Sequence, residues 1–189
     1  MSSEVLVEKR KLKNPPLNIH TLGDRVLRQS AKRISKVDDE IRELARQMLQ
    51  TMYSADGIGL AAPQVAVGKQ LIVVDTDPEE PANQPIILLN PKIRRYSDDL
   101  ALGQEGCLSI PGVYLDVRRP AQIEVAFKDE QGRPQVIVAT DLLARVIQHE
   151  MDHLTGVMFV DRVENSLLLN QELTKQGFSK QAVKPVEAA

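Results

Sequence analysis

Hydrophobic and polar positions follow two different periods along the chain, which predict helices and strands in turn. Between residues 39 and 54, apolar side chains recur every three or four positions, which is the spacing of one helix face. Asp38 precedes this segment and is expected to be its N-cap. The helix is predicted to end near Ser54, because Asp56-Gly57 breaks the pattern. A shorter helical segment is predicted from Gly23 to Ala31.

Short apolar runs bounded by turn-forming residues predict strands in the middle of the chain. The predicted strands cover residues 71–75, 86–90, 93–96, 113–117, 122–127 and 135–139. The second of them is expected to end at Pro91. The last two are expected to form a hairpin around the turn at 129–132.

A second helix is predicted from the spacing of apolar residues between positions 142 and 154. Thr140 or Asp141 can cap its start, and Gly156 stands where a C-terminal glycine cap belongs. Because its apolar surface is broad, this helix is expected to run through the core rather than over it. Phe159-Val160 predicts a short extended piece after it.

The length of 189 residues suits one domain. A last helix is predicted from Ser166 to Gln176, with Gly177 as its stop. Residues 1–16 are expected to form an extended arm, 17–178 a single domain and 179–189 a flexible tail.

Composition and charge narrow the class of protein. The chain has 24 basic and 26 acidic residues, 3% aromatic residues and no Trp, which argues against a nucleic-acid-binding surface. No apolar run is long enough for a membrane span, and the N-terminus lacks the apolar core of a signal peptide. Its basic residues Lys9, Arg10, Lys11 and Lys13 are interpreted as a solvated arm; a weak contact with an acidic group is the alternative. The single cysteine, Cys107, suits a reducing compartment.

Candidate chemistry enters with the segment Gln148–Gly156, which contains the motif H-E-x-x-H. On a helix, His149 and His153 lie on one face, one turn apart, so that both imidazoles can bind one metal ion. Glu150 can then reach a water molecule on that ion. The alternative is an amphipathic helix that carries two histidines by chance.

A catalytic metal usually has three protein ligands, so a third must be found. In zinc proteases with the longer form of the motif, the third ligand is a His six residues after the second, but Phe159 stands there. The remaining histidine, His20, lies far upstream. A distant Glu can serve, as in another protease class. Cys107 is the other candidate, because it lies in a glycine-bounded turn rather than inside an apolar run.

Three segments together resemble the three signature motifs of peptide deformylases, in their usual order. They are Gly57–Gln64 (GIGLAAPQ), Glu105–Ser109 (EGCLS) and Gln148–His153 (QHEMDH). The resemblance implies an α+β fold in which antiparallel or mixed sheets surround a central metal-binding helix, with a helix near each end of the chain. It also implies an enzyme that removes the formyl group from N-formylmethionine at the start of nascent polypeptides and releases formate.

The resemblance implies Cys107, His149 and His153 as the metal ligands. It implies Fe²⁺ as the working ion, with Zn²⁺, Ni²⁺ or Co²⁺ as substitutes. Glu150 would accept the proton of the attacking water and later deliver it to the leaving amine.

The resemblance also assigns the groups that hold the oxyanion of the reaction. They are the side-chain amide of Gln64 and the backbone N–H of Leu108. For Gln64, a structural hydrogen bond to its own turn is the alternative.

Substrate-binding residues are expected on both sides of the metal. Gly57 and Gly59 leave room for an extended substrate backbone, and Ile58 and Gly106 would supply main-chain contacts. Ile58, Leu142 and Val146 would line a pocket for the methionine side chain.

Two positions depart from a common form of the family pattern. Tyr114 stands where many relatives carry Arg, and Arg145 stands where an apolar residue is often found at the pocket rim. Both indicate an altered preference beyond the methionine rather than lost chemistry. Glu105 and Arg119 either pair and brace the Cys107 loop or are two solvated charges.

Two other functions fit part of the pattern. A metalloprotease with a distant carboxylate ligand leaves the Cys107 segment unexplained, and a non-enzymatic structural metal domain would need a fourth strong ligand. The resemblance implies a nascent formylated polypeptide as partner, transient ribosome contact, no direct nucleic-acid specificity, no membrane and a monomer. The expected location is the cytoplasm; an organelle stroma is the alternative, although no transit peptide is recognisable.

Overall fold

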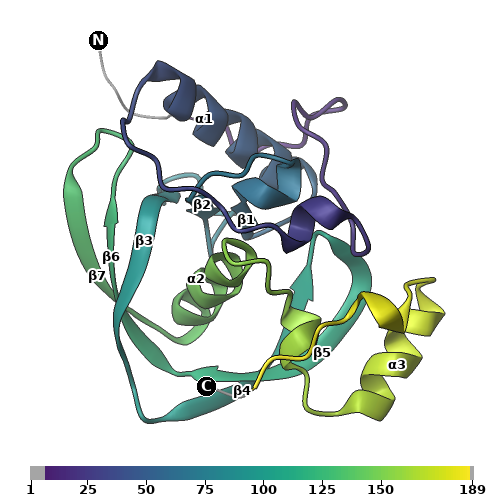
Figure 1. Ribbon diagram of the computed structural model, residues 1–189. Helices are drawn as coiled ribbons and strands as arrows, with labels where there is room; N and C mark the ends of the chain where they lie inside the picture. Colours follow the sequence, from purple (N-terminus) through teal and green to yellow (C-terminus); the bar gives the residue numbers. More distant parts are fainter. Residues whose placement is uncertain (1–6, 188–189) are drawn as a thin grey trace.

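Two antiparallel sheets surround one helix in the structure, a computed structural model that describes residues 7–187 (Figure 1). The larger sheet has the order β1 (Gly59–Ala61), β2 (Leu71–Val74), β3 (Ile86–Tyr96), β6 (Gln122–Lys128), β7 (Pro134–Thr140). The smaller sheet pairs β4 (Leu100–Cys107) with β5 (Ile110–Pro120). The enclosed helix is α2 (Asp141–His153). The predicted α+β class with a central helix is confirmed, and every strand pair of both sheets is antiparallel.

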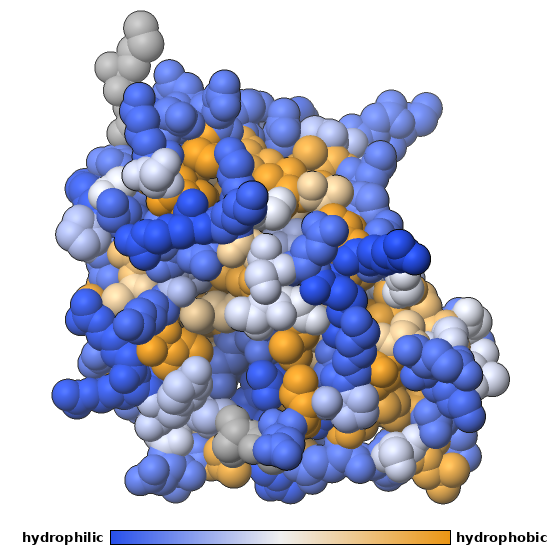
Figure 2. Space-filling view, in the orientation of Figure 1, coloured by the Kyte–Doolittle hydropathy of each residue, from blue (hydrophilic) through white to orange (hydrophobic). Residues whose placement is uncertain are grey.

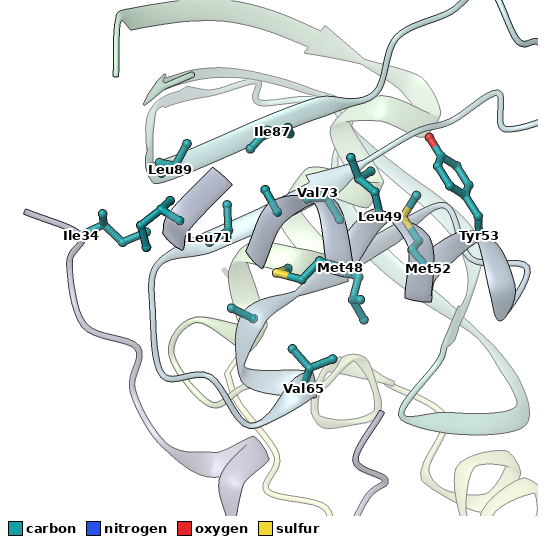
Figure 3. Packing of buried hydrophobic residues seen from close by; sticks show 14 residues of the cluster. Ile34, Met48, Leu49, Met52, Tyr53, Val65, Leu71, Val73, Ile87 and Leu89 are labelled. Atoms are coloured by element: carbon teal, nitrogen blue, oxygen red, sulfur yellow. The ribbon is translucent and has the colours of Figure 1, made fainter. Parts of the chain in front are cut away.

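Helix α1 (Asp39–Ser54) covers the outer side of the larger sheet. The side chain of Asp38 accepts a hydrogen bond from the N–H of Ile41, so the predicted N-cap is confirmed. The apolar face of α1, which includes Met48 and Leu49, packs on the sheet against residues such as Leu71 (Figure 3). This burial is what fixes a helix whose other face is polar.

Helix α2 runs through the core, as its broad apolar surface predicts. Ala144 and Ile147 are fully buried and pack in one cluster with Ile72 and Leu88 of the larger sheet. Thr140 stands at the N-cap position, but its side chain makes no capping hydrogen bond. The turn that ends the helix reaches Gly156, whose N–H donates to the carbonyl of residue 153.

The sheets differ from the sequence-based expectation at one proline and two strands. β3 does not end at Pro91 but continues to Tyr96, because the register with β6 shifts between Leu89 and Lys92. Asn90 takes the left-handed conformation there, with φ 52°, so the proline lies in a bulge and interrupts no ladder bond. β1 and β4 were not predicted as strands.

The short elements differ more strongly from those predicted from the sequence. The helical segment expected from Gly23 to Ala31 is only a 3₁₀ turn, Arg25–Arg28. The piece at Phe159-Val160 is not extended but begins another 3₁₀ turn, Phe159–Arg162. The last helix is confirmed as α3 (Ser166–Lys175).

Both ends of the chain are attached to the domain where the structure describes them. The ammonium group of Lys9 lies 2.7 Å from Asp75 and is mostly buried, so the interpretation of a solvated arm is wrong for this residue. Residues 179–187 belong to the expected flexible tail, and they contain a 3₁₀ turn and contacts with the domain. In this segment the carbonyl of Ala182 accepts a hydrogen bond from Arg28, and the N–H of Lys184 donates to Asp161 at 2.8 Å. Residues 1–6 and 188–189 lie outside the described part, and the division into arm, domain and tail stays a prediction.

The viewed surface is mostly hydrophilic, with separate apolar groups between the charged side chains (Figure 2). One apolar group lies beside α3, where Leu167 and Leu168 are exposed. Among the described residues, no helix has the length and apolar character that crossing a membrane requires.

Candidate metal centre and active site

Three side chains that can bind a metal come together between the two sheets. Cys107 ends β4, while His149 and His153 lie one turn apart on α2. One donor atom from each lies within 4.8 Å of the other two, and the Cys107 sulfur is 3.4 Å from Nε2 of His153. A thiolate with two imidazoles is a donor set for a divalent transition metal, so these residues fit such an ion.

Glu105 orients the first of the two histidines. Its Oε2 lies 2.9 Å from Nδ1 of His149, which leaves Nε2 of that ring free to face a metal. Burial raises the pKa of Glu105, but hydrogen bonds from Arg119 and His149 outweigh it and hold that pKa well below its ordinary value. The carboxylate is therefore ionised.

The expected pair between Glu105 and Arg119 is confirmed, with two hydrogen bonds of 2.6 and 2.9 Å. Arg119 also donates to Asp152 at 2.9 Å, and Arg162 donates to the same carboxylate at 2.7 Å. Asp152 therefore faces away from the three candidate ligands. This chain of paired charges lies behind them and neutralises the buried Arg119.

The two histidines respond differently to their surroundings. Burial lowers the pKa of His153 well below its ordinary value, and the charge of His149 acts in the same direction, so His153 is neutral and able to bind a metal. Burial also lowers the pKa of His149, but hydrogen bonds to Cys107 and Glu105 raise it well above its ordinary value. These neighbours therefore favour a positive charge on the His149 ring. Phe159 stands six residues after His153, where the longer protease motif has its third ligand. Its ring stacks on the His149 ring with centroids 5.8 Å apart.

Glu150 is buried and lines the same cleft as Cys107 and His149. Burial raises its pKa to about 7, which suits a group that accepts and returns a proton near neutral pH. Its Oε2 has no hydrogen-bond partner among the described residues. A Cβ atom on Gly59 would lie 2.4 Å from Oε1 of Glu150, so only glycine leaves room for this carboxylate.

Gln64 is held in one orientation by its neighbours. Its Oε1 accepts a hydrogen bond of 2.8 Å from the N–H of Ala61. Its Nε2 consequently points at the site, 3.5 Å from the Cys107 sulfur and 3.1 Å from the hydroxyl of Ser109. The structural hydrogen bond to the turn therefore exists, and it aims the donor end of the amide toward Cys107. The role of Ser109 was not foreseen from the sequence.

A cleft of about 590 Å³ opens in front of these groups. Its lining includes all five residues expected to bind substrate, together with Cys107, Leu108, His149 and Glu150; the five are Ile58, Gly59, Gly106, Leu142 and Val146. Gln64 and His153 lie deeper, each 1% exposed. Tyr114 lies at the mouth, 61% exposed, with its ring against Gly106.

Three convergent metal-binding side chains, a free buried carboxylate and an apolar cleft define a metal-dependent hydrolase. The family model described as polypeptide deformylase matches residues 16–167. The chain belongs to the polypeptide deformylase family, which confirms the family expected from the three motifs and makes the protein an enzyme.

Known relatives cover nearly the whole chain. It is 70% identical over 186 residues to peptide deformylase 1 of Nostoc sp., covering 98% of this chain and all of the relative. It is 67% identical to a peptide deformylase from Synechococcus elongatus, crystallised with actinonin, with a TM-score of 0.94 and 95% and 98% of the two chains covered. The peptide deformylase of Thermotoga maritima gives a TM-score of 0.74 at 36% identity, with 78% and 97% covered. These relatives do not favour the metalloprotease or the structural metal domain.

Proposed function

We propose that this enzyme removes the formyl group from N-formylmethionine at the start of nascent polypeptides and releases formate. One observation carries the proposal. Cys107, His149 and His153 converge beside the free carboxylate of Glu150 in a cleft large enough for a peptide end. Membership of the polypeptide deformylase family supports the same activity.

We propose Fe²⁺ as the working ion, held by Cys107, His149 and His153, with Zn²⁺, Ni²⁺ or Co²⁺ as substitutes. The support for iron is the family resemblance, whereas intrinsic affinity alone would favour zinc over ferrous iron. When bound, the ion acidifies a water molecule and polarises the formyl carbonyl.

The protein's own groups move the proton and hold the developing charge. Glu150 takes the proton of the attacking water on Oε2, which has no other partner among residues 7–187, and passes it to the leaving amine nitrogen. Nε2 of Gln64 and the N–H of Leu108 donate hydrogen bonds to the oxyanion as it forms. The hydrogen bond from Ala61 keeps the Gln64 amide turned the right way before substrate arrives.

The substrate lies extended in the cleft, with main-chain contacts to Ile58 and Gly106 and close approach at Gly59. Leu142 and Val146 line the pocket for the methionine side chain. A formyl group is small, so acyl groups with additional carbon atoms are excluded by size.

The remaining expectations follow from this substrate. We propose transient contact with the ribosome, because the substrate is a nascent chain, and a monomer without direct nucleic-acid specificity or membrane attachment. The proposed location is the cytoplasm.

The test is hydrolysis of a formyl-Met-Ala peptide by protein prepared without oxygen and loaded with Fe²⁺, with acetyl-Met-Ala as the control substrate. We expect formate from the first peptide and no acetate from the second. The Glu150→Ala variant is expected to retain the metal and lose the activity, because the proton acceptor is missing. Absence of formate release by metal-loaded wild-type protein would refute the proposed function.

A further inference from the structure

We propose that Arg145 is a positioning residue that ties the hairpin carrying Cys107 to the helix carrying His149 and His153. It thereby holds the three metal ligands at binding distance. This inference rests on the proposed metal site. Arg145 also lines the cleft, and the altered preference beyond the methionine that was expected from this residue stays a prediction.

The contacts of Arg145 all go to the hairpin. Its Nη1 donates to the carbonyl of Val117 at 2.8 Å and to that of Gly103 at 3.3 Å. Its Nη2 donates to the carbonyl of Ala101 at 2.8 Å. The same Nη1 lies 2.9 Å from Oε1 of Glu105, the carboxylate that orients His149. The side chain is 12% exposed and both of its Nη atoms bond to the hairpin, so the guanidinium is held in place.

The position of the hairpin needs such a link. The two sheets share no strand pairing over residues 7–187, so no ladder of hydrogen bonds fixes β4 and β5 to the larger sheet. The chain joins them to it at their far ends, and the N–H of Leu22 donates to the carbonyl of Ser109 at the turn between them. Cys107 lies at the opposite end, where β4 turns into β5. Arg145 lies one turn before His149 on α2 and holds both strands between these two ends. Two other links join α2 to the hairpin, from Asp152 to Arg119 and from Gln148 to the carbonyl of Pro120, whereas Arg145 bonds to the backbone of both strands.

Gly103 provides an independent way to remove this link. A Cβ atom there would lie 2.9 Å from both Cζ and Nη2 of Arg145. The contact is with the end of a flexible side chain, and Gly103 does not require the left-handed conformation. Gly103→Ala is therefore expected to displace the guanidinium without changing any charge and without straining the strand.

The experiment compares wild type with Arg145→Met, Arg145→Lys and Gly103→Ala. Arg94→Met and Gly68→Ala are the matched controls, since Arg94 is exposed and Gly68 has open space around it. Each protein is loaded with Co²⁺, whose charge-transfer absorption reports the Cys107 thiolate bond. The rate at which a chelator removes the ion is then measured.

We expect Arg145→Met and Gly103→Ala to lose Co²⁺ about 10- to 100-fold faster than wild type, as is usual when groups that orient metal ligands are removed. Their thiolate absorption should weaken. Arg145→Lys should behave like Arg145→Met, because one ammonium cannot reach four acceptors in different directions. Both control variants should match wild type.

The double variant adds a further check. Since both substitutions remove the same link, Gly103→Ala should have little additional effect in the Arg145→Met background. If wild type binds Co²⁺ and both Arg145→Met and Gly103→Ala retain it as well as wild type does, the proposed link is wrong and the metal site stands. Full retention by Arg145→Lys would also refute the link, because charge alone would then suffice. If wild type binds no Co²⁺ through Cys107, the proposed metal site fails and the link with it.

Discussion

Replacing Glu105 with Gln removes the negative charge that faces two arginines and a histidine inside the protein. The carboxylate accepts hydrogen bonds from Arg119 at 2.6 and 2.9 Å and from Arg145 at 2.9 Å, and it pairs with Nδ1 of His149 at 2.9 Å. In Glu105→Gln, one oxygen becomes an NH₂ group that points donors at donors. The two guanidinium groups then keep their burial without this partner.

The size of the effect follows from these contacts. Breaking a buried ion pair by removing one partner typically costs about 3–5 kcal/mol. Asp152 remains 2.9 Å from Arg119 and offsets part of that cost, so we expect a loss of about 3 kcal/mol in the free energy of unfolding. For a chain of this size, such a loss lowers the melting temperature by about 6–12 °C.

The assay is denaturant unfolding of metal-free protein, so that metal binding adds nothing to the measured stability. Glu164→Gln is the control, because Glu164 pairs with Arg118 at the surface and its loss should leave the free energy of unfolding nearly unchanged. A decrease below about 1 kcal/mol in Glu105→Gln would show that the buried arginines do not depend on this carboxylate.

Three further predictions concern other parts of the molecule. Gly59→Ala places a Cβ atom against Glu150 and should lower kcat on formyl-Met-Ala by about 100-fold or more, with the fold retained by circular dichroism; unchanged kcat would exclude Glu150 as the proton carrier. Asp129→Asn should destabilise the protein at neutral pH. Burial opposes the shift, but hydrogen bonds, first from Arg133, lower the pKa of Asp129, so its contribution is present above the unfolded value of about 4 and is lost as the pH falls through the lowered folded value. Denaturant unfolding of both proteins at several pH values checks this, and an equal difference at pH 2 and pH 7 would contradict it. Asn90→Ala removes hydrogen bonds of 2.8 Å to both the N–H and the carbonyl of residue 34 and should cost about 1–3 kcal/mol in thermal unfolding, whereas a neutral result would mean that water replaces the amide.

The helices and two of the three candidate ligands could be predicted from the sequence because their signals are local. Asp38 and the apolar spacing after it mark α1, and the four-residue interval between His149 and His153 needs only helix geometry to bring the rings together. Cys107 required a different argument, by resemblance and by the scarcity of other ligands, because nothing local connects it to α2.

What the sequence did not reveal depends on contacts between distant residues. β4 escaped prediction because its face toward α2 carries Gly103 and Glu105 rather than apolar residues, so no alternation is visible. The contact of Glu105 with His149 joins positions 44 residues apart and has no local signal. β3 passes through Pro91 because the shifted pairing with β6 relieves the proline of a ladder bond, which the strand's own residues do not reveal.

The attachment of the chain's last residues has a consequence for its own synthesis. Asp161 pairs with Arg28 near the beginning of the chain and accepts the N–H of Lys184 near its end, while Arg28 also holds the carbonyl of Ala182. A ribosome releases residues in order, so this cluster cannot close while positions 182–184 are still inside the exit tunnel. The enzyme that we propose acts on nascent chains therefore acquires its own full set of contacts only after residues 182–184 have left the tunnel.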